Sequence, residues 1–445
     1  MQKSNWKIAV LLIFITWISY EWIFFFNPLE YGGPVFLAFT FTVKLGLPIL
    51  LILIIGMPSI NLLNRNIHIG LYIIFFVLFI LWATFPTLLF GDFLEILKLI
   101  PRFLLFVGTL TLFIKYPAAI SAYGKLIFCV VLLALFQYFG NYLFRTYESA
   151  VTIGGALMSG PYYLFGNVTS KMYFPGIDGP VLRLVGFWNE PSNASGTAFS
   201  SFFITRYIYN IQHNKVWKFA SYFSLLAGLL CFSNAGYLAF GVALIFGSFV
   251  AYNNHQFMIR FLKTTSIILF ASLFVLLALF GRSYVGNHYS GNSYLRAVVG
   301  LRDIDTQMAN PNGGRIELVA TAISEVIENP LGMGIQSIGN KGISASASAP
   351  VYWFYFTGIV GFIFLLFREG VFFSAALKCI KKAPVSIFLV QAWIVILIQQ
   401  LSYGSWMNPN YLIISAAVLS LTVKKRVVDG YQCSPKVDAP YIQAL

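Results

Sequence analysis

Charged side chains are scarce in this sequence, and their scarcity excludes an ordinary soluble fold. Asp, Glu, Lys and Arg make up only 10% of the 445 residues, whereas 58% are hydrophobic. A soluble domain typically carries about 25% charged residues, because charge keeps its surface hydrated. A lipid-facing surface must instead exclude charge, since a charged side chain at the bilayer centre costs about 2.5–3.5 kcal/mol. The composition therefore predicts an integral membrane protein.

Cysteine and histidine are also rare, with four residues of each type. The cysteines are Cys129, Cys231, Cys379 and Cys433; they lack metal-ligand spacing, and none is expected on the outer face of a membrane. We therefore predict no disulfide, no metal site and no cofactor. Walker, dinucleotide-binding and zinc signatures are absent from the sequence as well.

Acidic residues are the scarcer charged class, which leaves a net charge of +14. A basic soluble protein would suggest a nucleic-acid partner. Here the positive residues lie mostly in short loops between apolar segments, which is the pattern of membrane topology. We therefore expect membrane lipids, and no nucleic acid, as partners.

Long apolar runs are what the sequence has in abundance. A membrane-spanning helix needs about 20 mostly apolar residues. Such segments lie near residues 8–26, 34–56, 69–90, 95–115, 123–143, 191–209, 217–233, 235–252, 264–281, 350–367, 384–402 and 409–423. They predict an all-α polytopic membrane protein with about 12 transmembrane helices and two long outer loops.

The order of these segments divides the chain into five parts. The first transmembrane helices occupy residues 1–143, a first outer loop occupies 144–190, and a second group of transmembrane helices occupies 191–281. A large outer loop follows at 282–349, and residues 350–445 hold the last transmembrane helices and a cytoplasmic tail. Both long loops contain aromatic and apolar residues, so we expect them to fold as caps over the outer face.

The distribution of Lys and Arg predicts the orientation. With the N-terminus inside, most of the 29 basic residues fall in inner segments, and the short outer loops carry none. Arg368 belongs to this inner set, in a loop expected after residue 367. Because inner loops are enriched in Lys and Arg, both termini are expected in the cytoplasm.

The large outer loop contains one clear helix. Apolar residues recur at helical spacing between Gly313 and Glu328, and Asn329-Pro330 predicts its end. Gly332 and Gly334 predict a turn directly afterwards. A helix with one apolar face outside the membrane is expected to pack on the transmembrane bundle or on the interface.

The first candidate site is the run from Arg183 to Ser192, where the first outer loop enters a span. Pro191 suits a first helical turn, so a helix N-terminus would point outward and favour a phosphate. Arg183 could add a two-point phosphate contact, and Glu190 is a candidate general base. Asn189 and Ser192 are candidate binding residues at the same helix end. In the structural alternative, Glu190 only caps the helix and Arg183 only pairs with it.

Two further candidates lie in the large loop. Arg315 is expected to start its helix, where a cation opposes the helix dipole, and this suggests an anion-binding role. The alternative is an arginine that faces solvent or lipid headgroups. His288 is the one histidine expected outside, and it is a weaker candidate for substrate binding.

Basic residues inside predicted spans form the last group. Lys44, Lys98 and Arg102 lie in segments where charge is expensive and often marks a substrate contact. Lys44 either contacts an anionic headgroup or substrate phosphate, or forms an internal ion pair, for which Glu21 is the candidate partner. Lys98 and Arg102 share one helix face and are near enough to the outer side for snorkelling.

These features resemble the bacterial O-antigen polymerase and ligase superfamily (Wzy- and WaaL-like proteins). The resemblance rests on three runs: Arg183…Gly186…Glu190-Pro191-Ser192, Arg315…Ala322…Asn329-Pro330-Leu331-Gly332-Met333-Gly334, and Val351-Tyr352-Trp353-Phe354 through Gly358-Ile359-Val360-Gly361. It implies a GT-C-like architecture in the bacterial inner membrane, with the active site facing the periplasm or cell exterior. Outer-face arginines, here Arg183 and Arg315, would be catalytic by holding the diphosphate leaving group. The resemblance leaves the base unassigned, and Glu190 is the candidate that the residues themselves offer.

The resemblance also implies an activity. Its members use oligosaccharides on undecaprenyl diphosphate as donor and acceptor, without a cofactor, and a chain-length regulator is an expected partner. Ligases of the group tend to carry a histidine before the span that follows the large loop, but Ser344 to Pro350 contains none. This departure favours a polymerase, with a ligase as the near alternative. A transporter or flippase is the alternative of a different class, although the internal repeat of many transporters is not evident.

Overall fold

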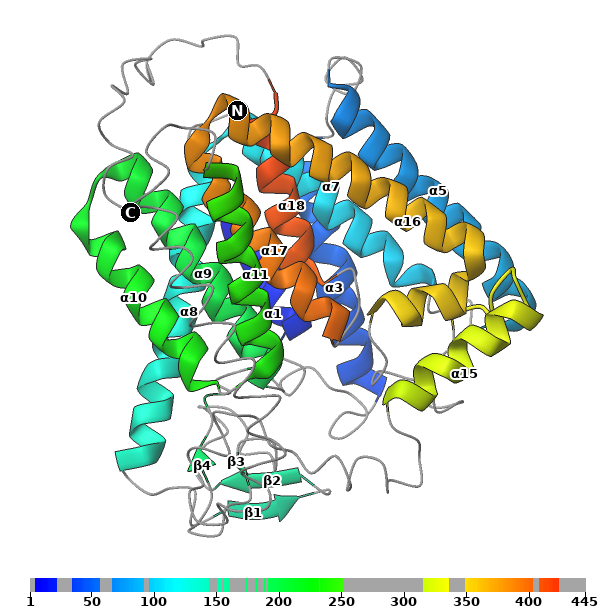
Figure 1. Ribbon diagram of the computed structural model, residues 1–445, viewed down its shortest axis with the longest axis horizontal. Helices are drawn as coiled ribbons and strands as arrows, with labels where there is room; N and C mark the ends of the chain where they lie inside the picture. The colour runs from blue at the N-terminus through cyan, green and yellow to red at the C-terminus, as the bar shows by residue number, and fades with distance from the viewer. Residues whose placement is uncertain are drawn as a thin grey trace.

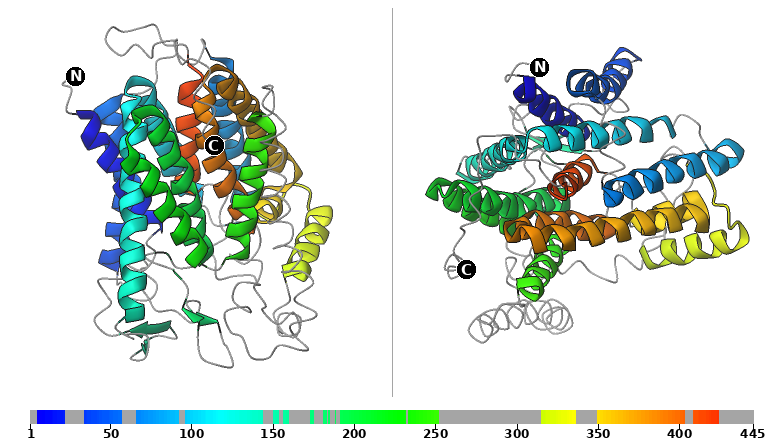
Figure 2. Two further views of the ribbon diagram at one scale, coloured as in Figure 1. Left: turned by 60° about the vertical axis from the view of Figure 1, so that its left-hand side comes forward. Right: turned by 90° about the horizontal axis from the view of Figure 1, so that it is seen from above.

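The computed structural model describes residues 5–21, 34–56, 66–91, 96–143, 150–153, 156–159, 173–174, 181–182, 184, 188, 191–231, 233–251, 315–335, 349–402 and 408–423. These residues form a bundle of α-helices with two small pairs of β-strands at one end (Figure 1). Most helices lie roughly along one axis of the bundle. Helices that follow one another in the chain mostly run in opposite directions along this axis (Figures 1 and 2).

The described helices are α1 (Asn5–Glu21), α3 (Pro34–Ile55), α5 (Ile67–Phe90), α7 (Leu99–Lys115), α8 (Ala118–Leu143), α9 (Pro191–Gln212), α10 (Lys215–Leu230), α11 (Asn234–Ala251), α15 (Arg315–Glu328), α16 (Ala349–Lys382), α17 (Ile387–Ser402) and α18 (Pro409–Leu421), with the 3₁₀ turn η4 (Pro384–Ser386). Every predicted apolar segment coincides with one of them except 264–281, which lies outside the described residues. Within the described residues, three stretches, Ile67–Phe90, Ala118–Gly140 and Pro350–Lys382, are long and apolar enough to cross a membrane. The helical fold is thus confirmed, and the number of spans stays a prediction.

The segment predicted as the first outer loop departs from the all-α prediction. β1 (Ala150–Ile153) pairs antiparallel with β2 (Ala156–Ser159), and β3 (Tyr173–Phe174) pairs antiparallel with β4 (Val181–Leu182). The β-branched residues of β1 favour extended backbone, a local preference that the search for long apolar runs does not detect. We call the end of the bundle that carries these strands the strand end.

The opposite end collects positive charge, and we call it the basic end. Asn66, before α5, donates to Thr422, after α18, over 2.7 Å, and Lys382 of α16 lies 3.5 Å from the carbonyl of Thr422. Lys115 of α7 donates to the carbonyl of Ile55 over 2.5 Å. A cation at that position stabilises the negative end of the α3 dipole. Lys215, Lys218, Lys378 and Lys381 lie at the helix ends of the same region.

The predicted helix of the large loop is confirmed as α15, which ends at Glu328. It packs against α16, and Tyr355 donates a hydrogen bond to Glu325 over 2.7 Å. The predicted turn follows, with positive φ angles of +91° at Gly332 and +70° at Gly334. Ile335, at its end, donates its N–H to the Thr87 hydroxyl of α5 over 2.9 Å. The described part of this loop therefore packs on the strand end of the bundle.

Helix α16 is longer than predicted. It runs from Ala349 to Lys382 with one interruption at Gly358, whereas the sequence suggested a span that ends at residue 367. The placement of Arg368 in an inner loop is therefore wrong. Arg368 lies within the helix and is fully buried, because the next residue, Glu369, neutralises its charge. The adjacent charges of Arg368 and Glu369 suggest the end of a membrane span in the sequence, but the helix continues through them to Lys382.

Helix α18 occupies the middle of the bundle. Its residues from Pro409 to Ser420 are all buried, and it packs against α7 and α17. Viewed from above, it lies between α7 on one side and α16 and α17 on the other (Figure 2, right). Its 13 residues span about 20 Å, less than the roughly 30 Å of a bilayer core. Because α18 ends at the basic end, its N-terminus is recessed inside the bundle.

Candidate functional site

Three of the basic residues predicted to bind substrate lie together in one cluster. Lys44 lies on α3, Lys98 is the N-cap residue of α7, and Arg102 follows in the first turns of α7. Helices α3 and α7 pack against each other, and the charges of Arg102 and Lys98 both act on Lys44. Lys44 and Arg102 are half-buried, and Lys98 is exposed. We call these three residues the basic cluster.

The basic cluster lies in the half of the bundle toward the strand end. Helices α3 and α7 run in parallel, since Gly108 packs against Leu51 and Lys115 bonds the carbonyl of Ile55 at the basic end. Counting back from Lys115 at 1.5 Å per residue places Arg102 about 20 Å from the basic end. The three like charges repel one another, and an anion bound between them would interact favourably with all three.

The start of α9 was predicted to form another part of the site. Pro191 begins the helix as expected, and the carbonyl of Ser192 accepts a hydrogen bond from Ser195 over 2.8 Å. Asn193 accepts a hydrogen bond from Gln399 of α17 over 2.7 Å. The two helices approach closely here, because a Cβ atom on Gly196 would lie only 1.8 Å from Gln399 Oε1. This contact fixes the start of α9 against the end of α17.

The remaining predicted residues are not placed by the structure. Arg183, Asn189, Glu190 and His288 lie outside the described residues. Arg315 is the first residue of α15, but its side chain is also outside the described part. Their roles in catalysis and substrate binding stay predictions, as does the pairing of Lys44 with the Glu21 carboxylate.

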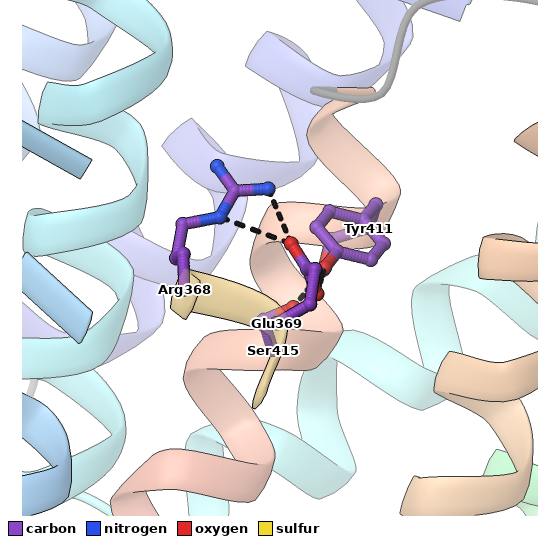
Figure 3. A network of polar contacts seen from close by, with 4 residues as sticks. All are labelled: Arg368, Glu369, Tyr411 and Ser415. Atoms are coloured by element: carbon purple, nitrogen blue, oxygen red, sulfur yellow. Dashed lines mark hydrogen bonds and ion pairs between the residues drawn. The ribbon is translucent and has the colours of Figure 1, made fainter. Parts of the chain in front are cut away.

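A polar network in the middle of the bundle was not predicted (Figure 3). Arg368 donates from Nε and Nη2 to Glu369 Oε1 over 3.0 and 2.5 Å. Tyr411 of α18 donates its hydroxyl to the other oxygen of Glu369, and Ser415 donates to the carbonyl of Tyr411 over 2.8 Å. The network therefore joins α16 to α18 at the bundle centre.

The burial of this network explains its composition. The Arg368 side chain is 0% exposed and that of Glu369 is 13% exposed. The guanidinium also lies over the rings of Tyr72 and Phe76, at 5.5 and 5.0 Å from their centroids. A buried charge is tolerated when it is paired and hydrogen-bonded, and Glu369 supplies the pairing and accepts from Nε and Nη2, whereas Nη1 has no hydrogen-bond partner among the described residues. Adjacent residues on a helix do not usually face each other, which is why the sequence did not reveal the pair.

The described residues contain no group of three or more His, Cys, Asp or Glu side chains that could hold a metal ion. Comparisons of the chain with protein-family models and with curated proteins found no match. The function must therefore be argued from the chemistry of these residues.

Proposed function

We propose that this chain is an integral membrane glycosyltransferase that joins undecaprenyl-diphosphate-linked oligosaccharide repeat units into a surface polysaccharide, such as O-antigen, capsule or exopolysaccharide. In this proposal about twelve helices span the bacterial inner membrane in a GT-C-like arrangement. Both termini lie in the cytoplasm, and the strand end faces the periplasm or cell exterior.

The surface of α5 supports the membrane setting. Ile74, Leu81 and Leu88 lie on one stripe of this helix and are 52%, 63% and 63% exposed. Such a stripe would be unfavourable in water and is favourable against lipid. The lysines at the basic end support the orientation, because inner segments are enriched in Lys and Arg.

The basic cluster is the observation that carries the proposed activity. Charge within an apolar bundle is expensive and is usually retained for function. Lys44, Lys98 and Arg102 together match a diphosphate, which carries several negative charges on adjacent groups. The cluster lies toward the strand end, which in this proposal faces outward and is where a lipid-linked donor would present its headgroup. We therefore propose that it binds the donor diphosphate.

The proposed reaction uses this charge to stabilise the leaving group. An acceptor hydroxyl attacks the anomeric carbon of the donor sugar, and the bond from that carbon to the phosphate oxygen breaks. The negative charge that develops on the lipid diphosphate is stabilised by the basic cluster. Glu190 is the proposed base that takes the hydroxyl proton, and Arg183 and Arg315 are proposed further ligands of the diphosphate.

The ion pair of Arg368 and Glu369 is the one observation that favours a transporter, the second candidate. Charges inside a bundle often line a transport path. However, both charges belong to neighbouring residues of α16 and bond to each other, and aromatic rings pack over the guanidinium. This closed arrangement better suits a structural role, so the polymerase is the preferred function.

The test uses the surface glycan of a deletion strain, separated on a gel. We expect the deletion to leave single repeat units attached to their final lipid acceptor. Wild-type protein and the control variant Lys218→Met, changed at an exposed lysine of the basic end, should restore the polymer. Lys44→Met, Arg102→Met and Arg315→Ala should not restore it, although the proteins accumulate normally.

Other outcomes would redirect the assignment. Polymer that accumulates on its lipid carrier, unattached, would mean a ligase. Loss of every glycan from the outer face would mean a flippase. Normal polymer in the Lys44→Met and Arg102→Met strains would contradict the role of the basic cluster.

A further inference from the structure

Gln400 is a buried amide that the fold leaves unsatisfied. The residue is 3% exposed, and neither Nε2 nor Oε1 has a hydrogen-bond partner within the described chain. Two other glutamines of α17 are satisfied: Gln391 donates to the carbonyl of Ala243 over 3.0 Å, and Gln399 donates to Asn193. Buried polar groups are normally hydrogen-bonded, so an exception asks for an explanation.

Helix geometry shows where Gln400 points. Trp393 lies two helical turns earlier on the same face of α17, and its ring packs against that of Tyr411, with centroids 6.0 Å apart. Tyr411 belongs to the first turn of α18. Gln400 lies about 10 Å further along α17, beyond the point where α18 begins. Its side chain is therefore directed at the region in front of the α18 N-terminus.

The start of α18 offers hydrogen-bond donors to the same region. Asn408 caps the helix by accepting from the N–H of Asn410 over 2.8 Å. The Asn410 side chain is 1% exposed, and its Oδ1 accepts from Tyr123 over 3.4 Å. Its Nδ2 has no acceptor among the residues that the structure describes. A helix N-terminus also carries partial positive charge, which favours an anionic group.

The basic cluster lies at the same depth. Helix α7 packs against α18, and both end at the basic end. Arg102 of α7 and Pro409 of α18 each lie about 20 Å from that end at 1.5 Å per residue. The recessed start of α18, the two unsatisfied amides and the basic cluster therefore occupy one layer of the bundle.

We propose that this layer holds the sugar–phosphate junction of the lipid-linked donor, with Gln400 binding hydroxyls of the first sugar and Asn410 and the α18 N-terminus facing phosphate oxygens. An amide that lacks both a donor and an acceptor partner requires a group that both accepts and donates. A hydroxyl meets this requirement, whereas an ionised phosphate only accepts. The inference rests on the proposed function and adds to it the residue that recognises the sugar.

The test measures binding of prenyl diphosphates to the purified protein in lipid nanodiscs. The probes are farnesyl diphosphate and three farnesyl diphosphates that carry glucose, galactose or N-acetylglucosamine. The wild type should bind at least one glycosylated probe about tenfold more tightly than farnesyl diphosphate, a preference of about 1.4 kcal/mol. Gln400→Leu and Gln400→Met should lose this preference and keep the affinity for farnesyl diphosphate.

Thermal stability separates recognition from a structural role. Gln400→Leu and Gln400→Met should melt at or above the wild-type temperature, because they remove an unsatisfied buried group. The control Gln391→Leu should melt lower, since it loses the bond to Ala243, yet it should keep the sugar preference.

The failures of the two proposals are distinguishable. A Gln400 variant that keeps the sugar preference, or a wild type that binds all probes equally, would overturn the inference and leave the proposed function standing. Wild-type protein that binds none of the four probes would overturn both.

Discussion

Arg368 and Glu369 are neighbours in sequence, and they meet in a two-point ion pair at the centre of the bundle, with Nε and Nη2 at 3.0 and 2.5 Å from one carboxylate oxygen. The other carboxylate oxygen accepts from Tyr411, so the charge of Glu369 is shared between α16 and α18. The two helices are thereby held at a fixed register in a region otherwise packed with aromatic rings.

Removing one partner of this pair should be strongly destabilising. Glu369→Gln leaves the Arg368 charge buried and uncompensated, and we expect a loss of about 3–5 kcal/mol in the free energy of unfolding. The double variant Arg368→Met with Glu369→Gln should recover most of that loss. Thermal and denaturant unfolding in detergent measure both. Equal losses in the single and double variants would show that the pair is not coupled.

Tyr411→Phe tests the link between the two helices. It removes the hydroxyl that donates to the Glu369 carboxylate, and hydrogen bonds to charged groups contribute about 1.5–3 kcal/mol. Tyr237→Phe is the matched control, because its hydroxyl donates to a backbone carbonyl, that of Leu229, at an exposed position. We expect a clearly lower melting temperature for the first variant than for the second. Equal melting temperatures would argue against the link.

Gly358 should not tolerate a side chain. Its φ of +63° is unfavourable for other residues, and a Cβ atom there would lie 2.2 Å from the carbonyl oxygen of Pro330. Gly358→Ala should therefore cost at least about 1–3 kcal/mol and loosen the segment that follows α15. Gly370→Ala, on the same helix and with no atom within 4 Å of the added Cβ, should be neutral or stabilising. Limited proteolysis between α15 and α16, compared for the two variants, provides the measurement.

Lys44→Met should separate stability from activity. It removes a positive charge on which Lys98 and Arg102 act, so we expect stability to rise by roughly 0.5–1 kcal/mol at low salt and less at high salt. Polymer formation should be lost at the same time, since functional sites are often retained at a cost in stability. Melting curves at two salt concentrations test the first part. Lower stability of the variant would instead favour the internal ion pair as the role of Lys44.

The positions of the helices could be predicted because their signal is local and long. Apolar runs and the Asn329-Pro330 stop are written in consecutive residues, and the structure confirms them for the described helices and for α15. The sequence offered Lys44, Lys98 and Arg102 as separate candidates, but their assembly into the basic cluster depends on α3 packing alongside α7 in parallel. That register is a tertiary property, and no feature near Lys44 specifies it.

The missed features share one physical cause, which is that each depends on the packing of helices and side chains in three dimensions and not on the composition of one segment. Arg368 looked like the end of a span because its own charge is expensive, and only the contacts with Glu369 and Tyr411 remove that cost. The segment that became α18 looked like an ordinary span because its composition is apolar. Its central place depends on the helices around it, and so does the unsatisfied state of Gln400.

The short central helix also constrains how the bundle is assembled. Helix α18 is synthesised after α7, α16 and α17, the helices that enclose it, and at about 20 Å it is too short to cross a bilayer unaided. It would therefore enter the membrane as a hairpin with α17, into a space that the earlier helices have kept open. Until then the Glu369 carboxylate lacks its partner on α18, so an unfinished chain leaves one carboxylate oxygen in the bundle without that hydrogen bond. Ribosome stalling before residue 409 should consequently yield a chain that membrane quality-control proteases recognise, whereas completion of α18 closes the bundle in a single late step.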